Sequence, residues 1–555
     1  MILWLHLKHR LLCIEARIGA MQFAMPAWAQ LVIAAASAIS VVAFAFQRDL
    51  WAPFYEASDP DVNLIVQALM MNGGLPATLF DHPGYLTKLQ IAAWLNVLDF
   101  LGLVPFSDVQ TFFEGARSMG FGAAMTPLVV GIRVLCIVTA LLIVLTFGVL
   151  AGHATGSRLC GLVCAGLLST STGLLIHACI VRTEALSTLC FMVAVASLVS
   201  MTEGRLRPAV GFSVMGFFCY AAVLAKVQIV FGVLALPMIA VYLLRLRSGA
   251  HETAPDSPVV LPVLVSIPFL LKTSMVWANQ MQPDFAGNLH PVGGFPYFAV
   301  PIYLASSLLA MRFLAHVPLG SVVRYALFSL AGVSAAFYLH LIWYDERNIS
   351  SVLFFFDHLV AFLPPEQQQD GVFYSLLHGL WSTVAGFADP RYVIRRPTHL
   401  TYYLLVISAG YAVWRDVALD GLKKAAPLVL LAIGLETIFR IRSSPDNVGF
   451  YASHYRLYVE FLLFLAVALV GAGALREQAP RGRALAVLLC SGMVAIGGIG
   501  SVVNHGLLGP RGMGVSIDLP PDAIYNDASS NNPVLLRFLN DECGTDCASY
   551  IVRGQ

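Results

Sequence analysis

"PLVVGIRVLCIVTALLIVLTFGVL", residues 127–150, is a predominantly apolar stretch that decides the class of fold. A helix rises about 1.5 Å per residue, so this stretch is long enough to cross the ~30 Å hydrocarbon core of a bilayer. Comparable stretches recur along the 555-residue chain, which is 58% hydrophobic, only 12% charged and has a mean hydropathy of +0.76. Because these stretches lack the apolar–polar alternation of membrane strands, the sequence predicts an all-α polytopic membrane protein.

The apolar stretches predict about thirteen transmembrane helices. They lie at 27–46, 127–150, 159–178, 183–201, 209–225, 228–244, 259–277, 296–311, 319–343, 399–414, 425–439, 457–475 and 484–503. Cytoplasmic loops are enriched in Lys and Arg, and each loop predicted to be cytoplasmic contains such residues: Arg158, Arg205, Arg207, Arg245, Arg247, Arg312, Lys423, Lys424, Arg476, Arg481 and Arg483. Residues 27–503 are therefore expected to form the membrane bundle.

The basic N-terminal segment, residues 1–26, is expected in the cytoplasm, either as a surface helix or as an over-extended start before Met21 or Met25. It lacks the clean apolar region of a cleavable signal. An odd number of spans then places the tail, residues 504–555, outside the cytoplasm. Cys543 and Cys547 in this polar tail predict a disulfide, as expected of an oxidising compartment.

Two further long segments, 47–126 and 344–398, are expected on the outer side. Each contains an amphipathic run that predicts a helix on the membrane surface: "GYLTKLQIAAWLNVLDFLG", residues 84–102, with Lys88 and Trp94, and "SSVLFFFDHLVAFL", residues 350–363. A hydrophobic scaffold alone would not need interfacial helices in its outer loops.

Ionisable residues gather at the outer ends of the predicted spans, where each costs about 2.5–3.5 kcal/mol to insert. Arg182 and Glu184 lie at one outer junction and Lys226 at the next. The last outer hairpin carries Arg440, Arg442, His454, Arg456 and Glu460. One interpretation is an Arg182–Glu184 pair with Lys226 extending to the surface. Because three separate outer junctions carry cations, we favour a site for an anion.

The first outer segment opens with an acidic cluster, Glu56, Asp59 and Asp61, and reaches His82-Pro83-Gly84 after a helix-like apolar run. Cations that hold a phosphate, facing a carboxylate that accepts a proton, form a recognisable catalytic arrangement. The net charge of +1 gives no indication of a nucleic-acid partner.

The order of these features resembles the GT-C membrane glycosyltransferases, in particular the branch of protein O-mannosyltransferases and the lipid A aminoarabinose transferase. "SDPDVNLIVQALMMNGGLPATLFDHPGYL" is similar to the family's acidic first loop, although Pro60 replaces the usual second acid. "VRTEALSTLCFMVAVA" is similar to its Arg-Pro-Asp/Glu start of a span, and "AAVLAKVQIVFGVLALP" to its Leu-x-Lys element. "SHYRLYVEFLLFLAVAL" is similar to a late Arg-Tyr element but lacks the proline.

This resemblance implies a GT-C-like bundle that transfers a sugar from a polyprenyl-phosphate donor to a hydroxyl of a lipid, glycan or protein acceptor, with inversion. It implies Asp59 as general base, or Asp61 if the register differs by two, on the periplasmic face of a bacterial inner membrane. It implies Arg182, Lys226 and Arg456 as phosphate contacts and Glu56, His82, Glu184 and His454 as positioning residues. No cofactor or catalytic metal is expected. There are competing interpretations without a functional role. Glu56 is then a solvated surface acid, and His82-Pro83-Gly84 is a simple turn.

Two other functions compete with this one. A secondary transporter also places charges within a bundle, but the sequence shows no matching halves. A lipid-linked-glycan ligase or flippase would bind the same lipid but use a late outer loop, and 344–398 contains suitable charges at Asp345, Glu346, Arg347, Arg391, Arg395 and Arg396.

Overall fold

The computed structural model of the protein describes residues 27–48, 61–75, 84–248, 259–280, 318–341, 377–385, 400–440, 450–477, 480–502 and 533–543. Over these ranges the chain forms helices and turns and contains no strand. The chain divides into two compact units. Unit 1 comprises residues 1–44, 141–176 and 373–513, and unit 2 comprises residues 45–140, 177–372 and 514–555.

The helices confirm an all-α membrane fold. Eight of the described helices are long and apolar enough to cross a membrane, or nine if one bent pair counts as a single span. Each of the thirteen predicted spans coincides with a helix except 296–311, which lies outside the described residues. Some of these helices are short, such as α19 (Leu400–Arg415, 16 residues), so the count of thirteen stays a prediction.

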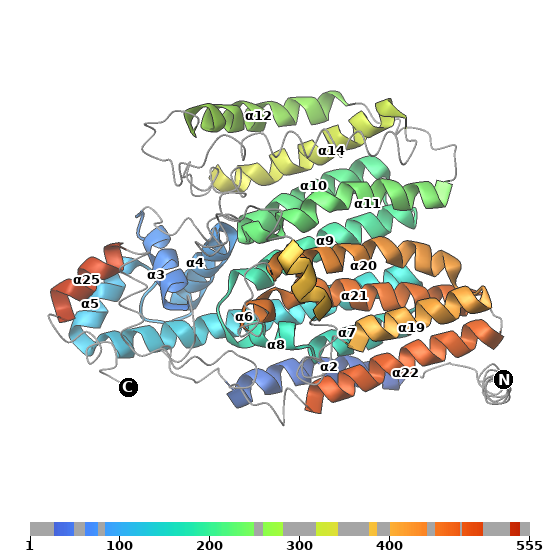
Figure 1. Ribbon diagram of the computed structural model, residues 1–555. Coiled ribbons are helices and arrows are strands. Elements are labelled where there is room, and N and C mark those ends of the chain that lie inside the picture. Colours follow the sequence, from blue (N-terminus) through green and yellow to red (C-terminus); the bar gives the residue numbers. More distant parts are fainter. Residues whose placement is uncertain are drawn as a thin grey trace. The chain divides into compact units, whose positions relative to one another are not determined.

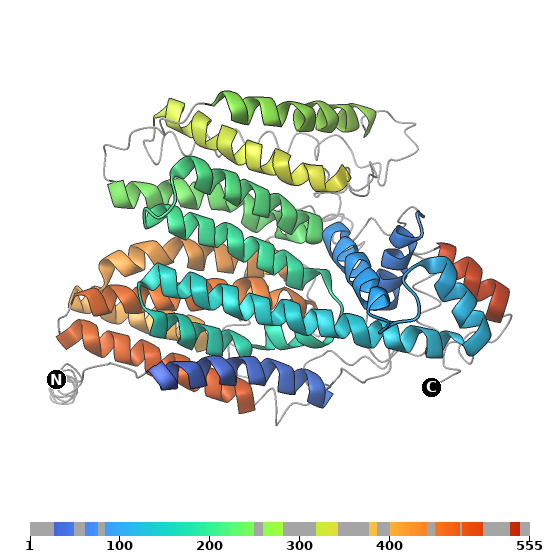
Figure 2. The same ribbon diagram turned by 180° about the vertical axis from the view of Figure 1, so that it is seen from behind.

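Unit 2 contains a layer of helices that run side by side (Figures 1 and 2). These are α9 (Thr183–Thr202), α10 (Pro208–Ala225), α11 (Val230–Ser248), α12 (Val260–Gln280) and α14 (Leu319–Phe337), with the short 3-10 helices η2 (Val227–Ile229) and η3 (Tyr338–Leu341). The hydroxyl of Ser187 on α9 donates to the carbonyl of Ala222 on α10 at 2.8 Å, which ties these two helices together near one end. That end carries Arg182 and Lys226.

The first outer segment folds into three helices, α3 (Asp61–Asn72), α4 (Tyr85–Phe100) and α5 (Val109–Met119), which pack against the start of α6 (Phe121–Thr155). The tail contributes α25 (Pro533–Cys543) to the same hydrophobic core. Phe538 of α25 stacks on Phe113 of α5 at 4.1 Å between ring centroids, and Glu542 pairs with Arg117 at 2.8 Å. This packing is that expected of a tail and a first loop on the same side of a membrane.

The helix predicted at 84–102 is present as α4. Lys88, however, is buried in the protein and does not lie at the membrane surface. Lys88 is 1% exposed, and the indole N–H of Trp94 donates to the carbonyl of Gly131 on α6 at 2.9 Å. The physical reason is that α4 turns this face toward other helices of unit 2 and exposes Phe100, at its end, instead. The helix predicted at 350–363 and the Cys543–Cys547 disulfide lie outside the described residues and side chains.

Unit 1 contains the end of α6 and all or most of the remaining helices, which are α2 (Ala27–Arg48), α7 (Arg158–Ser169), α8 (Thr172–Cys179), α19, α20 (Leu419–Phe439), α21 (Phe450–Arg476), α22 (Pro480–Val502) and the helical stretch 377–385. The predicted span 159–178 is broken into α7 and α8, which meet at 65°. The break falls at Ser169-Thr170-Ser171, where the hydroxyl of Ser171 accepts from the Leu174 amide at 3.3 Å. Such side-chain bonds compete with the helical ladder.

Candidate active site

Arg182 and Glu184 occupy the start of α9. Arg182 is the N-cap residue in an extended conformation, with φ −137° and ψ 153°, and Glu184 lies in the first helical turn. Both side chains are buried. A carboxylate is stabilised at this end of a helix, whereas a cation is not. The local fold therefore favours the charge of Glu184, whereas the guanidinium of Arg182 gains nothing from this end of the helix dipole.

Lys226 lies at the break between α10 and α11, where the backbone becomes extended before the 3-10 turn η2. Its ammonium is 3.1 Å from a carboxylate oxygen of Glu184, and the two side chains are 5% and 2% exposed. This contact corrects the interpretation in which Lys226 extends to the surface. The packing of α9 against α10 brings Lys226 to Glu184.

The first outer loop packs directly on this junction. A Cβ at Gly84 would overlap the Cγ2 atom of Thr183, between Arg182 and Glu184, and would lie 3.7 Å from Leu64 of α3. A side chain at position 84 would therefore force Thr183 to move. Leu86 packs against a hydrophobic cluster that includes Tyr220 and Leu224 of α10. The beginnings of α3 and α4 therefore both lie beside the turn that carries Arg182 and Glu184.

Of the acidic cluster, only Asp61 lies within the described residues. Asp61 is the first residue of α3, one helical turn before Leu64, although its side chain is not described. The short helix expected after the acids is confirmed as α3, which ends at Asn72 before Gly73 and Gly74. Glu56, Asp59 and His82 lie outside the described residues. Their roles, and the choice between Asp59 and Asp61 as base, stay predictions.

Arg456 is buried on α21 in unit 1, and Glu460 lies one turn further along the same helix. A Cβ at Gly173, in the first turn of α8, would lie 2.5 Å from Oε2 of Glu460 and 2.8 Å from the amide nitrogen of Leu457. The carboxylate of Glu460 thus sits against the N-terminal turn of a broken span, where negative charge is favoured. The helix continues through His454, whose side chain is not described.

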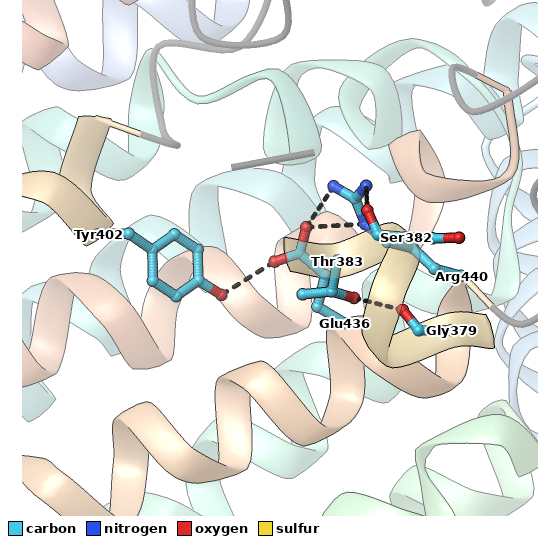
Figure 3. A network of polar contacts seen from close by, with 6 residues as sticks. All are labelled: Gly379, Ser382, Thr383, Tyr402, Glu436 and Arg440. Carbon is cyan, nitrogen blue, oxygen red and sulfur yellow. Dashed lines mark hydrogen bonds and ion pairs between the residues drawn. The ribbon is translucent and has the colours of Figure 1, made fainter. Parts of the chain in front are cut away.

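A second buried charge network lies at the end of α20 (Figure 3). The guanidinium of Arg440, 0% exposed, donates to one carboxylate oxygen of Glu436 at 2.7 and 3.1 Å and to the carbonyl of Ser382 at 3.0 Å. The other carboxylate oxygen accepts from the Tyr402 hydroxyl at 2.9 Å. The network ties α19, α20 and the stretch 377–385 together, which makes it a structural clamp within unit 1.

Tyr402→Phe is expected to lower the stability of the protein by about 1.5–3 kcal/mol, the contribution of a hydrogen bond to a charged group. The buried carboxylate of Glu436 would keep Arg440 but lose the hydroxyl donor. The thermal midpoint in detergent measures the effect. Tyr242→Phe, at a half-exposed tyrosine of α11, is the matched control, and equal midpoints for the two variants would contradict the clamp.

Sequence reasoning missed two of these features. The burial of Lys88 depends on which face of α4 meets the bundle, and the amphipathic pattern alone does not report it. The Glu436–Arg440 pair did carry a signal, because the two residues are four apart on one helix face within an apolar span. Among the residues described, no group of three or more His, Cys, Asp or Glu side chains is arranged to hold a metal.

No protein-family model and no curated protein matches the chain. Similar solved structures include the Archaeoglobus fulgidus oligosaccharyltransferase complexed with zinc and sulfate, at a TM-score of 0.46 and 11% identity over 94% of this chain and 57% of the other. Another is the archaeal oligosaccharyltransferase AglB from Archaeoglobus fulgidus in complex with an inhibitory peptide and a dolichol-phosphate. It matches at a TM-score of 0.46 and 10% identity, over 95% of this chain and 60% of the other. The chain thus spans under two thirds of the length of these enzymes.

Proposed function

We propose that this integral membrane protein is a GT-C-type glycosyltransferase that moves a sugar from a polyprenyl-phosphate donor to an acceptor hydroxyl, with inversion. The observation that carries the proposal is the packing of the first outer loop, through Gly84, on the buried turn of Arg182 and Glu184. A loop that begins with carboxylates thereby ends beside buried cations. The proposed location is the periplasmic face of a bacterial inner membrane, and the acceptor is a lipid, glycan or protein.

The proposed chemistry is one displacement at the anomeric carbon. The acceptor oxygen forms a bond to this carbon while the bond from the carbon to the phosphate oxygen breaks, and the bonding electrons leave with the lipid phosphate. The acceptor proton passes to Asp59 or Asp61, since a hydroxyl is a poor nucleophile until its proton is removed. Glu56 and His82 are proposed to position the acceptor.

The cations meet the charge that develops on the leaving phosphate, which stabilises the transition state more than the ground state. Arg182 is the principal phosphate contact in this proposal. Lys226 shares its charge with Glu184, so Glu184 orients the ammonium and moderates its affinity for the donor. Arg456 is proposed as a further phosphate contact and His454 as a positioning residue.

Replacing Arg182 by Met is expected to weaken binding of undecaprenyl phosphate by about 10- to 100-fold, because a hydrogen bond to a charged group contributes roughly 1.5–3 kcal/mol. Binding to the purified protein in nanodiscs measures the change. Arg205→Met, at an exposed arginine beyond the other end of α9, is the control and should bind normally. A wild-type protein without affinity for this lipid, or an Arg182→Met variant with full affinity, would overturn the proposal.

Secondary transport is the second candidate, and the break between α7 and α8 beside the buried Glu460 favours it. Transporters use discontinuous helices and intramembrane charges in this way. The two functions separate in detergent micelles, where there are no compartments to transport between. Release of labelled sugar from a polyprenyl-phosphate donor to an acceptor in micelles supports transfer, whereas solute uptake seen only in sealed vesicles supports transport.

A further inference from the structure

We infer that Thr87 and Gln228 recognise hydroxyl groups of the donor sugar, an inference that rests on the proposed function. Both are uncharged polar residues of unit 2 with buried polar atoms that have no hydrogen-bond partner among the residues described. They come from segments 141 residues apart, the first outer loop and the α10–α11 junction. Both segments contribute to the candidate active site.

Thr87 lies in the first turn of α4, three residues after Gly84, the residue that meets Thr183. Lys88 is four residues after Gly84. Residues at these two spacings lie on the same side of a helix. The Lys88 amide donates to the Gly84 carbonyl at 2.7 Å, which is the first helical hydrogen bond of α4. Thr87 is only 3% exposed. Thr87 is therefore buried one helical turn after the approach of Gly84 to the Arg182–Glu184 turn.

The hydroxyl of Thr87 behaves unlike those of other helical threonines in unit 2. Thr126, Thr139 and Thr188 each donate to the carbonyl four residues earlier, at 2.8, 2.9 and 2.8 Å. A buried threonine ordinarily satisfies its hydroxyl in this way. Thr87 Oγ1 has no partner within the described ranges, neither on its own helix nor on a neighbour.

Gln228 lies in the 3-10 turn η2, two residues after Lys226. Its side chain is half-buried, but both carboxamide atoms, Nε2 and Oε1, are inaccessible to solvent and lack a partner in the described part of the chain. A buried polar group without a partner costs about 1–3 kcal/mol. A ligand that supplies both a donor and an acceptor would recover this free energy.

The chemistry of these groups favours a sugar over a phosphate. Phosphate oxygens only accept hydrogen bonds, so they would satisfy Nε2 of Gln228 but leave Oε1 without a donor. The charged donor two residues away, the Lys226 ammonium, is paired with Glu184. A sugar hydroxyl both donates and accepts, and two neighbouring hydroxyls match a carboxamide. The cations thus bind the phosphate of the donor, and Thr87 and Gln228 bind its sugar.

The test compares undecaprenyl phosphate with undecaprenyl phosphate carrying glucose, mannose, galactose or arabinose. The wild-type protein in nanodiscs should bind at least one glycosylated lipid more tightly than the bare lipid. Gln228→Met and Thr87→Val remove the hydrogen-bonding atoms at nearly constant volume. Each should reduce this sugar-dependent gain about tenfold, as expected for the loss of one or two hydrogen bonds, while affinity for the bare lipid stays unchanged.

Thr126→Val is the matched control, because the Thr126 hydroxyl bonds to its own helix, and it should leave the sugar-dependent gain intact. The thermal midpoints of Gln228→Met and Thr87→Val should equal or exceed that of the wild type, since each removes an unsatisfied buried group. A lowered midpoint with an unchanged sugar-dependent gain would show a structural role and overturn the inference. A wild-type protein that binds no lipid phosphate would instead overturn the proposed function.

Discussion

Asp59→Asn is expected to lower the rate of sugar transfer by a factor of about 10²–10⁴, the usual contribution of a general base. Asparagine keeps the shape of the side chain but cannot accept the acceptor proton as the new glycosidic bond forms. Binding of the donor should persist, because the cations that hold the phosphate are unchanged. Single-turnover transfer from a labelled polyprenyl-phosphate sugar measures the rate, and nanodisc binding measures the affinity.

The Asp61→Asn variant tests whether Asp61 rather than Asp59 is the general base. If Asp61→Asn abolishes transfer while Asp59→Asn does not, the carboxylate at the start of α3 is the base. Asp99→Asn is the control, because Asp99 also belongs to the first outer loop but accepts a hydrogen bond from the Ser107 hydroxyl at 2.8 Å. Full activity in both the Asp59→Asn and Asp61→Asn variants would rule out a base from this cluster.

The second large effect concerns the buried Lys226–Glu184 pair. Lys226→Met is expected to destabilise the protein by about 3–5 kcal/mol, because it leaves the buried Glu184 carboxylate without its ammonium partner. The double variant Lys226→Met/Glu184→Leu should recover most of that stability, since apolar side chains often replace a buried pair without loss. Thermal or denaturant unfolding in detergent measures both changes.

The double variant separates the structural role of the pair from its role in catalysis. It should remain folded yet bind the lipid phosphate more weakly and transfer sugar slowly, because the site has lost a cation. Lys424→Met is the control, since Lys424 pairs with Asp420 at the surface, where such pairs contribute at most about 1 kcal/mol. A stable double variant with wild-type transfer would restrict Lys226 to a structural role.

The glycines at 84 and 173 show why the site could be predicted only in part. The sequence marks both as small residues, but the partner of each is distant along the chain: Thr183 for Gly84, and Glu460 for Gly173. A pattern of residues reports periodicity within one segment, and it carries no information about which segments approach each other. The acidic loop and the cations were therefore recognisable as separate groups, and their junction was not.

The sequence by itself determined that this is a helical membrane protein, where most of its apolar helices lie, and which of their junctions carry cations. It could do so because hydrocarbon leaves the backbone no partner except itself, so a long apolar run must become a helix. Only the tertiary structure decided that Lys226 is buried against Glu184, that Lys88 is buried, and that the span at 159–178 is broken. These outcomes depend on packing between segments that are distant in sequence. A buried charge or a bent helix is stabilised by contacts with those segments, and the local sequence does not show which segments they are.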